Sequence, residues 1–183
     1  MKKKFGIKEV VAIGIGTALF VALTEVQIPI GIPNTYLQPR MAVFAFLAAV
    51  FGPIVGGVIG ILGHALGDLI FYGSVWWSWV IPEAVIGIAI GLLAKKFAIK
   101  EGGFGKKSII TFNVAQVLAN AVAWIVVAPA LDIIIYVEPA NKVFTQGAYA
   151  ALGNVLIIGI LGTLLASGYA KIGAKSSSLS KED

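Results

Sequence analysis

The sequence predicts an all-α membrane protein with six transmembrane helices, and three observations support this fold class. The 183 residues are 58% hydrophobic and 13% charged, whereas a soluble domain usually has about 25% charged residues. The mean hydropathy is +0.94. The apolar residues form long runs without the period-two alternation of membrane-spanning β-strands. Helices satisfy their own backbone hydrogen bonds in lipid, so they are the expected spanning elements.

Six apolar stretches supply the expected helices. A spanning helix needs roughly 20 mainly apolar residues, and each stretch reaches or approaches that length. The second stretch is short and begins close to the loop before it, while the Gly52-Pro53 pair separates it from the third by a tight turn. The expected helices cover residues 7–24, 40–51, 54–72, 76–93, 109–129 and 147–168.

We expect a single membrane domain over residues 1–183, and the sequences at both ends of the chain agree with it. Lysines precede the first apolar run, but no small-residue cleavage site follows a short apolar core, so the run is expected to be a retained helix rather than a signal peptide. The loops are too short to hold a soluble domain. Residues 176–183 are polar and are expected to form a disordered tail.

Basic residues are distributed unequally between the loops on the two sides. With six spans both termini share one side, and the positive-inside rule then places them in the cytoplasm of a multi-pass protein of the cell membrane. The basic residues that give the net charge of +5 are thus explained by the orientation of the protein in the membrane. No nucleic-acid partner is expected. Arg40 and Lys142 fall outside, whereas the inner side receives Lys2, Lys3, Lys4, Lys8, Lys95, Lys96, Lys100, Lys106, Lys107, Lys171, Lys175 and Lys181.

Polar and aromatic residues form stripes at helical spacing, mostly toward the outer side. Ionisable groups within a membrane are costly and usually face a cavity, where they mark function. A cavity lined by aromatic groups with a few polar ones is the usual form of a small-molecule site. The candidate substrate-binding residues are Asn34, Tyr36, Gln38, Arg40, His64, Asp68, Tyr72, Trp76, Trp79, Glu83, Asn113, Gln116, Asn120, Trp124, Asn141 and Asn154.

Structural explanations remain open for several of these residues. Trp76 could belong to the aromatic belt at the membrane boundary, and His64 and Asp68 could form a structural hydrogen-bonded pair. Asn113 and Asn120 could join helices, where a hydrogen bond contributes on the order of 1 kcal/mol. Loop residues Arg40, Asp132, Glu138 and Lys142 could close over the polar edge of a ligand.

A row of small residues at four-residue spacing lies on the first expected helix. Gly14, Ala18 and Ala22 would let another helix approach its backbone closely. The row could serve packing within the bundle or docking of a partner membrane protein. Glycines 56, 60, 63 and 67 repeat the spacing on the third helix, with the same two explanations.

The motif content favours a ligand-binding subunit that takes its energy from partners. The sequence has no Walker A motif, no HExxH and no GxSxG, and it has no cysteine for a thiolate site. No metal site and no catalytic cofactor are predicted, and the chain is not expected to be an enzyme. Two alternatives remain: a small membrane enzyme that uses His64, Asp68 and Glu83 as acid–base groups, and a scaffold without a ligand.

Several short stretches together resemble the S components of energy-coupling factor (ECF) transporters, over nearly the whole chain. The resemblance is closest to an uncharacterised group placed with the riboflavin-type S components and near the cobalamin-type ones. The stretches are Ile32-Pro33-Asn34-Thr35, Phe51-Gly52-Pro53, Gly63-His64-Ala65-Leu66, Tyr72-Gly73-Ser74, Trp76-Trp77-Ser78-Trp79, Thr111-Phe112-Asn113 and Glu138-Pro139-Ala140-Asn141-Lys142-Val143-Phe144.

The resemblance implies a mechanism, partners and a ligand class. An S component binds a vitamin from outside, joins a transmembrane coupling protein and two ATPase subunits, and topples in the membrane when the ATPases use ATP. The docking row of the family falls on Gly14, Ala18 and Ala22, although the family often has alanine where this chain has Gly14. The implied leading ligand is cobalamin or another corrinoid; riboflavin, a thiamine precursor or another small vitamin are the alternatives. Four tryptophans also suit stacking on a planar or macrocyclic ring.

Overall fold

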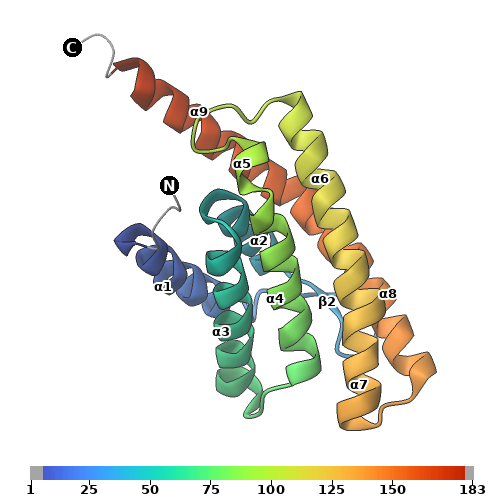
Figure 1. Ribbon diagram of the computed structural model, residues 1–183. Coiled ribbons are helices and arrows are strands. Elements are labelled where there is room, and N and C mark those ends of the chain that lie inside the picture. The colour runs from blue at the N-terminus through green and yellow to red at the C-terminus, as the bar shows by residue number, and fades with distance from the viewer. Residues whose placement is uncertain (1–5, 180–183) are drawn as a thin grey trace.

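The computed structural model describes residues 6–179, which form a helical bundle with one short β-hairpin (Figure 1). The two strands of the hairpin pair antiparallel, with Ile28 opposite Leu37. The elements in chain order are α1 (Ile7–Ala22), β1 (Ile28–Pro29), β2 (Tyr36–Leu37), α2 (Arg40–Phe51), α3 (Pro53–Tyr72), α4 (Trp77–Leu92), α5 (Ala94–Phe97), α6 (Lys106–Ala121), the π-helical turn η1 (Val122–Val127), α7 (Ala128–Tyr136), α8 (Ala140–Ile157), the π-helical turn η2 (Ile158–Gly162) and α9 (Thr163–Leu179).

The first four helices begin and end close to the expected residues. Gly52 separates α2 from α3 with a φ of +101°, a conformation that favours glycine, and Pro53 starts α3 at a position that needs no N–H donor. Gly73 ends α3 in the left-handed conformation, with a φ of +75°. These turn residues carry strong local signals, so their boundaries could be predicted.

The fifth helix extends beyond its expected end at residue 129. Residues Lys106–Tyr136 form one helical run through α6, η1 and α7. Most of the interval between the expected fifth and sixth helices, residues 130–146, is therefore helical rather than a loop. Pro129 is the second residue of α7, after Ala128, and so lies two residues beyond the end of η1. The ring of proline clashes with a normal α-helical turn before it, and the wider π-helical turn accommodates the ring without ending the helix.

The last helix is also longer than residues 147–168. It runs from Ala140 through α8, η2 and α9 to Leu179. Residues 176–179 of the expected disordered tail are therefore helical, and residues 180–183 lie outside the described part of the chain.

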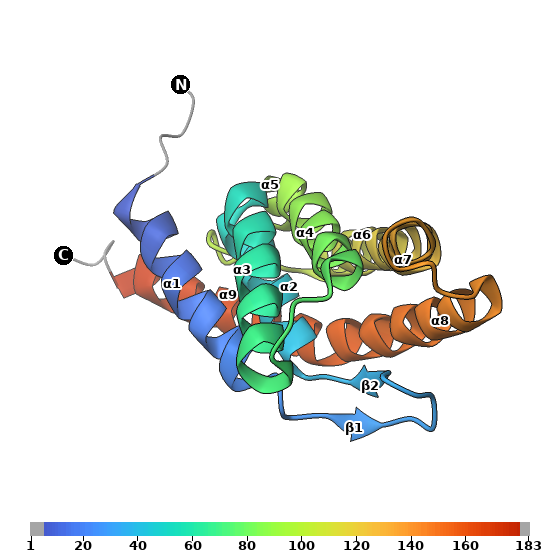
Figure 2. The ribbon, with the colours of Figure 1, turned by 90° about the horizontal axis from the view of Figure 1, so that it is seen from below.

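Three helical runs within the described residues are long and apolar enough to cross a membrane. They are Pro53–Tyr72, Lys106–Tyr136 and Ala140–Ala174, and α2 and α4 are shorter apolar helices. The expected count of six spans and the cytoplasmic side of the termini remain predictions. The start of α1 and the end of α9 lie on the same side of the molecule in Figures 1 and 2.

Glycines on α3 bring its backbone into close contact with α4. A Cβ atom built on Gly60 would lie 2.9 Å from the backbone N of Ala84, and one on Gly63 would lie 2.7 Å from the ring of Phe20 on α1. The glycine row on α3 therefore serves packing inside the bundle rather than docking of a partner. This close packing places α3 and α4 side by side at the centre of Figure 1.

The bundle has two distinct ends. The turn between α3 and α4 and the turn between α7 and α8 lie at the lower end in Figure 1, and the connection from α5 to α6 lies at the upper end. The hairpin runs along α8 at the edge of the bundle (Figure 2). Buried phenylalanines such as Phe44, Phe97 and Phe112 fill the core between the helices.

Candidate functional site

A cavity of about 450 Å³ opens between the hairpin, α3, α4, α7 and α8. Its volume falls within the range of about 300–1,000 Å³ that is typical of small-molecule sites. Five aromatic side chains and a group of charged and amide side chains supply most of the wall. The lining residues are Gln27, Asn34, Thr35, Tyr36, Gln38, Arg40, Met41, His64, Asp68, Tyr72, Ser74, Trp76, Trp79, Glu83, Trp124, Asp132, Glu138, Lys142, Val143, Gln146, Ala150 and Asn154.

A chain of buried ionisable groups joins α2, α3 and α4 at the inner wall of the cavity. Arg40 Nη2 lies 3.8 Å from Glu83 Oε1. The same oxygen lies 3.1 Å from His64 Nδ1, although this approach lacks hydrogen-bond geometry. His64 Nε2 lies 3.3 Å from Asp68 Oδ1, one helical turn away on α3. All four side chains are at most 7% exposed, so protein groups rather than water must compensate their charges.

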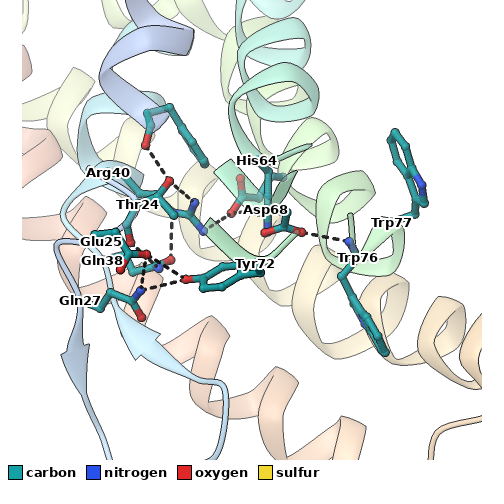
Figure 3. A network of polar contacts seen from close by, with 12 residues as sticks. Thr24, Glu25, Gln27, Gln38, Arg40, His64, Asp68, Tyr72, Trp76 and Trp77 are labelled. Atoms are coloured by element: carbon teal, nitrogen blue, oxygen red, sulfur yellow. Dashed lines mark hydrogen bonds and ion pairs between the residues drawn. The ribbon is translucent and has the colours of Figure 1, made fainter. Parts of the chain in front are cut away.

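Arg40 is held from several directions (Figure 3). Its Nε donates to Gln38 Oε1 at 3.0 Å, and its Nη1 donates to Thr24 Oγ1 at 3.0 Å. The guanidinium also lies over the ring of Phe20, 4.5 Å from the ring centre. Arg40 is therefore held by contacts to Phe20 of α1, to Thr24 and Gln38 beside the hairpin and to Glu83 of α4, with two of its five N–H donors in hydrogen bonds.

Asp132 on α7 collects three donors from α4 and the residue before it. Trp76 Nε1 donates to Oδ1 at 2.8 Å and Trp79 Nε1 donates to Oδ2 at 3.0 Å. The hydroxyl of Ser78 donates to Oδ1 at 2.5 Å. Hydrogen bonds to a carboxylate are stronger than neutral ones, so Asp132 fixes the orientation of two indole rings in the cavity wall.

Ring contacts extend this aromatic wall. Trp76 stacks on Tyr136 with the ring centres 3.9 Å apart, and Trp79 meets Trp124 edge to face at 5.1 Å. The backbone N–H of Trp76 donates to Asp68 Oδ2 at 3.0 Å, which connects the wall to the buried ionisable groups (Figure 3). The arrangement offers flat apolar surfaces beside carboxylates.

The hairpin and the helix ends form the rim of the cavity. Gln27 donates to the hydroxyl of Tyr72 at 2.9 Å (Figure 3), and Gln146 on α8 donates to the carbonyl of Pro33 at 2.9 Å. Lys142 and Glu138 form a rim ion pair at 2.6 Å. Because side chains tie the hairpin to both α3 and α8, the hairpin closes one side of the cavity.

Most of the predicted substrate-binding residues lie at this cavity. Asn34, Tyr36, Gln38, Arg40, His64, Asp68, Tyr72, Trp76, Trp79, Glu83, Trp124 and Asn154 line it, while Asn113, Gln116, Asn120 and Asn141 do not. Asn141 is exposed on the first turn of α8. The other three side chains connect α6 to α8 and α9 or to α6 itself, for example through Gln116 Nε2 to the carbonyl of Val155 at 3.2 Å.

Replacing Asn113 by alanine should lower stability slightly and leave ligand affinity unchanged. Asn113 Nδ2 donates to Thr163 Oγ1 at 3.0 Å and does not line the cavity. Hydrogen bonds between membrane helices contribute about 0.6 kcal/mol on average, so the free energy of unfolding should fall by about that amount. Thermal unfolding in detergent and equilibrium binding of the co-purified ligand measure the two effects. A tenfold loss of affinity would contradict the placement.

Several residues that line the cavity are absent from the predicted substrate-binding set. The sequence predicts Asp132, Glu138 and Lys142 in a loop, whereas Asp132 is on a helix and fixes two rings. The stretch from residue 130 to 136 contains no helix-breaking residue after Pro129, which could have indicated that the helix continues. The remaining lining residues outside the predicted set are Gln27, Thr35, Met41, Ser74, Val143, Gln146 and Ala150.

The small-residue row on α1 lies on the surface. Gly14, Ala18 and Ala22 are exposed, and a Cβ atom on Gly14 would meet no atom within 4 Å. The neighbouring row faces inward, because Ala12 and Gly16 are buried. The exposed row is therefore free to contact another molecule, while packing within the bundle uses the other face of α1.

Comparison with known proteins gives a consistent family. The family model described as "ECF-type riboflavin transporter, S component" matches residues 4–171. A UPF0397 protein of Exiguobacterium sp. is 51% identical over 179 residues, which cover 97% of this chain and 98% of that protein. A UPF0397 protein of Enterococcus faecalis is 48% identical over 183 residues, covering both chains completely. One of Lactobacillus helveticus is 50% identical over 183 residues, or 100% of this chain and 99% of the relative. No solved structure matches the chain.

Proposed function

The chain belongs to the family of ECF-type riboflavin transporter S components, and from this premise we propose that it is the membrane subunit that captures a vitamin or related micronutrient for an ECF importer. Membership makes it a membrane-embedded transporter component rather than an enzyme. The observation that carries the proposal is the cavity of about 450 Å³ between the hairpin and the helices. Its aromatic walls and few polar groups suit a small organic ligand.

The ligand is a small vitamin rather than a corrinoid. The family model is of the riboflavin type, which supports the alternative ligands over the leading expectation of cobalamin. The cavity volume lies in the lower half of the usual range of about 300–1,000 Å³, and a corrin macrocycle with its side chains is several times larger than a flavin or a pyrimidine. The twelve predicted residues that line the cavity are proposed as ligand contacts.

A membrane enzyme built on His64, Asp68 and Glu83 has little support. The buried carboxylates and the imidazole interact with one another and with Arg40, and the family has a transport role. The contacts suit a wall that holds its shape around a ligand.

Binding of the ligand by the isolated protein tests the proposal. Full-length protein in detergent, without ATPases or ATP, should bind one member of a vitamin panel with micromolar or tighter affinity. Uptake of the same vitamin should rescue an auxotroph that expresses the whole importer. If no vitamin binds and no auxotroph is rescued, the proposal is wrong.

The partners implied by the family are a transmembrane coupling protein and two ATPase subunits that use ATP. The exposed row Gly14, Ala18 and Ala22 is proposed as the docking face.

Replacing Ala18 by tryptophan should therefore abolish uptake and leave vitamin binding unchanged, because the bulky ring prevents close approach of a partner helix. Co-purification with the partners and uptake in cells measure docking, and binding in detergent measures the site.

A matched control is available on α9. Leu164 is 63% exposed on the apolar surface and lies outside the proposed docking face, so Leu164→Trp should preserve uptake. If Ala18→Trp transports as well as the unchanged protein, α1 does not dock through this row.

A further inference from the structure

We propose that the ligand of the cavity is a small organic cation with one positive charge, such as a protonated amine or a cationic heteroaromatic ring. The inference rests on the proposed function, since it concerns the ligand of the same site. It adds the charge of the ligand, and it separates cationic vitamins from neutral ones such as riboflavin.

Negative charge exceeds positive charge among the described residues that line the cavity. The carboxylates are those of Asp68, Glu83, Asp132 and Glu138, and the permanent cations are Arg40 and Lys142. With His64 neutral, the carboxylates exceed the cations by two charges. With His64 protonated, they still exceed them by one. A ligand with one positive charge lowers this excess in either state and cancels it when His64 is protonated.

The distribution of partners shows which carboxylates hold the excess. Glu138 is neutralised by Lys142 on the rim, and Arg40 is the cation next to Glu83. Among the described residues, the Asp132 carboxylate accepts from indole and hydroxyl groups, which solvate a carboxylate without cancelling its charge. Asp68 is held by His64 and by a backbone N–H. The excess charge therefore lies on two buried carboxylates of the cavity wall, one on α3 and one on α7.

Two buried side-chain atoms of cavity-lining residues, one acceptor and one donor, also lack a hydrogen-bond partner among the described residues. Glu83 Oε2 is buried and has no hydrogen-bond partner among the described residues, and Glu83 is 1% exposed. Trp124 Nε1 is likewise without a partner there, and Trp124 is 2% exposed. Leaving a buried polar group unpaired is costly. Both residues line the cavity, so a ligand with a donating cationic group and one acceptor atom would satisfy both.

The aromatic wall favours the same ligand class. Trp76, Trp79 and Trp124 line the same cavity as the carboxylates, together with two tyrosines. The face of an indole carries partial negative charge and attracts organic cations more strongly than other aromatic faces do. The indole N–H groups of Trp76 and Trp79 donate to Asp132, so this carboxylate orients both rings while it adds its own charge to the wall.

An anionic ligand fits this wall poorly. Gln38 and Thr24 hold two of the five N–H donors of Arg40, and its charge faces Glu83. Lys142 is paired with Glu138. A carboxylate or phosphate would enter next to two carboxylates in a region of low dielectric constant, where repulsion between like charges is strong. A neutral ligand would leave the excess charge uncompensated.

The charge of the bound molecule tests the inference. Full-length protein is purified in mild detergent from cells grown in rich medium and then denatured. Mass spectrometry gives the formula of the released molecule, and capillary electrophoresis gives its charge at pH 7. If nothing is released, binding of thiamine, riboflavin and pantothenate is measured as cationic, neutral and anionic probes. A released cation, or preference for thiamine, supports the inference. A neutral or anionic ligand overturns the inference and leaves the proposed function intact. Binding of none of the three overturns the inference, and the proposed function fails with it only if no vitamin of the wider panel binds and no auxotroph is rescued.

A charge-neutralising variant gives a second readout. Asp68→Asn keeps the size of the side chain and removes one negative charge, so binding of the released cation, or of thiamine, should weaken at least tenfold. Glu101→Gln removes the same charge from an exposed position in the connection from α5 to α6, outside this cavity, and should bind normally. Thermal unfolding confirms that both variants fold. Equal affinity of folded Asp68→Asn and the unchanged protein would overturn the inference.

Discussion

Replacing Arg40 by methionine should destabilise the protein by about 3–5 kcal/mol, because removal of one partner leaves a buried charge uncompensated. Glu83 is 1% exposed and Arg40 is 5% exposed. Methionine fills the space of the aliphatic stem but cannot donate to Thr24 or Gln38. Thermal unfolding in detergent and chemical unfolding measure the loss.

The double variant Arg40→Met with Glu83→Gln identifies the cause. Neutralising the glutamate removes the uncompensated charge, so much of the lost stability should return. Lys142→Met breaks the rim pair with Glu138, in which the lysine side chain is 46% exposed, and should cost at most about 1 kcal/mol. If Arg40→Met is no more harmful than Lys142→Met, the inner pair does not stabilise the fold.

Replacing Asp132 by alanine should weaken ligand binding by roughly 100-fold, because loss of charge-assisted hydrogen bonds of about 1.5–3 kcal/mol each releases the aromatic wall. Trp76, Ser78 and Trp79 lose their common acceptor at once. The indole rings are then free to turn into the cavity. Equilibrium binding of the co-purified ligand measures the affinity.

Ser78→Ala distinguishes the contribution of the two indole rings to ligand affinity from that of the Ser78 hydroxyl. This variant removes one donor from Asp132 and leaves both indole hydrogen bonds in place, so its effect on affinity should be much smaller than that of Asp132→Ala. Quenching of tryptophan fluorescence by the ligand reports whether the rings keep their positions. Wild-type affinity in Asp132→Ala would mean that ring contacts alone hold the wall.

The sequence allowed prediction of those helices whose ends carry local signals. Gly52 and Pro53 mark the turn from α2 to α3, and Gly73 ends α3. The stripe of His64 and Asp68 also lies at the cavity as predicted, because α3 is a regular α-helix in which residues four apart share a face.

The fifth helix shows why the rest could not be predicted. A regular helix would place Asn113, Gln116 and Asn120 on the same stripe as Trp124, yet only Trp124 lines the cavity. The three amides lie on the regular helix α6, before the π-helical turn η1 that contains Trp124, and they donate to α6, α8 and α9 rather than lining the cavity. The turn η1 widens the helix, so residues after it, such as Asp132, depart from the spacing of a regular α-helix. Sequence spacing contains no direct signal for this widening. The contacts between Asp132 and α4 depend on distant parts of the chain, so they too require the three-dimensional structure.

The π-helical turn η1 makes the cavity sensitive to the number of residues in this helix as well as to their identity. An α-helix advances by about 100° for each residue, so removing one residue from Val122–Val127 would rotate Asp132 by about that angle relative to α6. Asp132 would then point away from Trp76 and Trp79, although every residue of the wall would still be present. Among homologues, a one-residue deletion in this turn would therefore mark a change of ligand more clearly than a substitution in the wall.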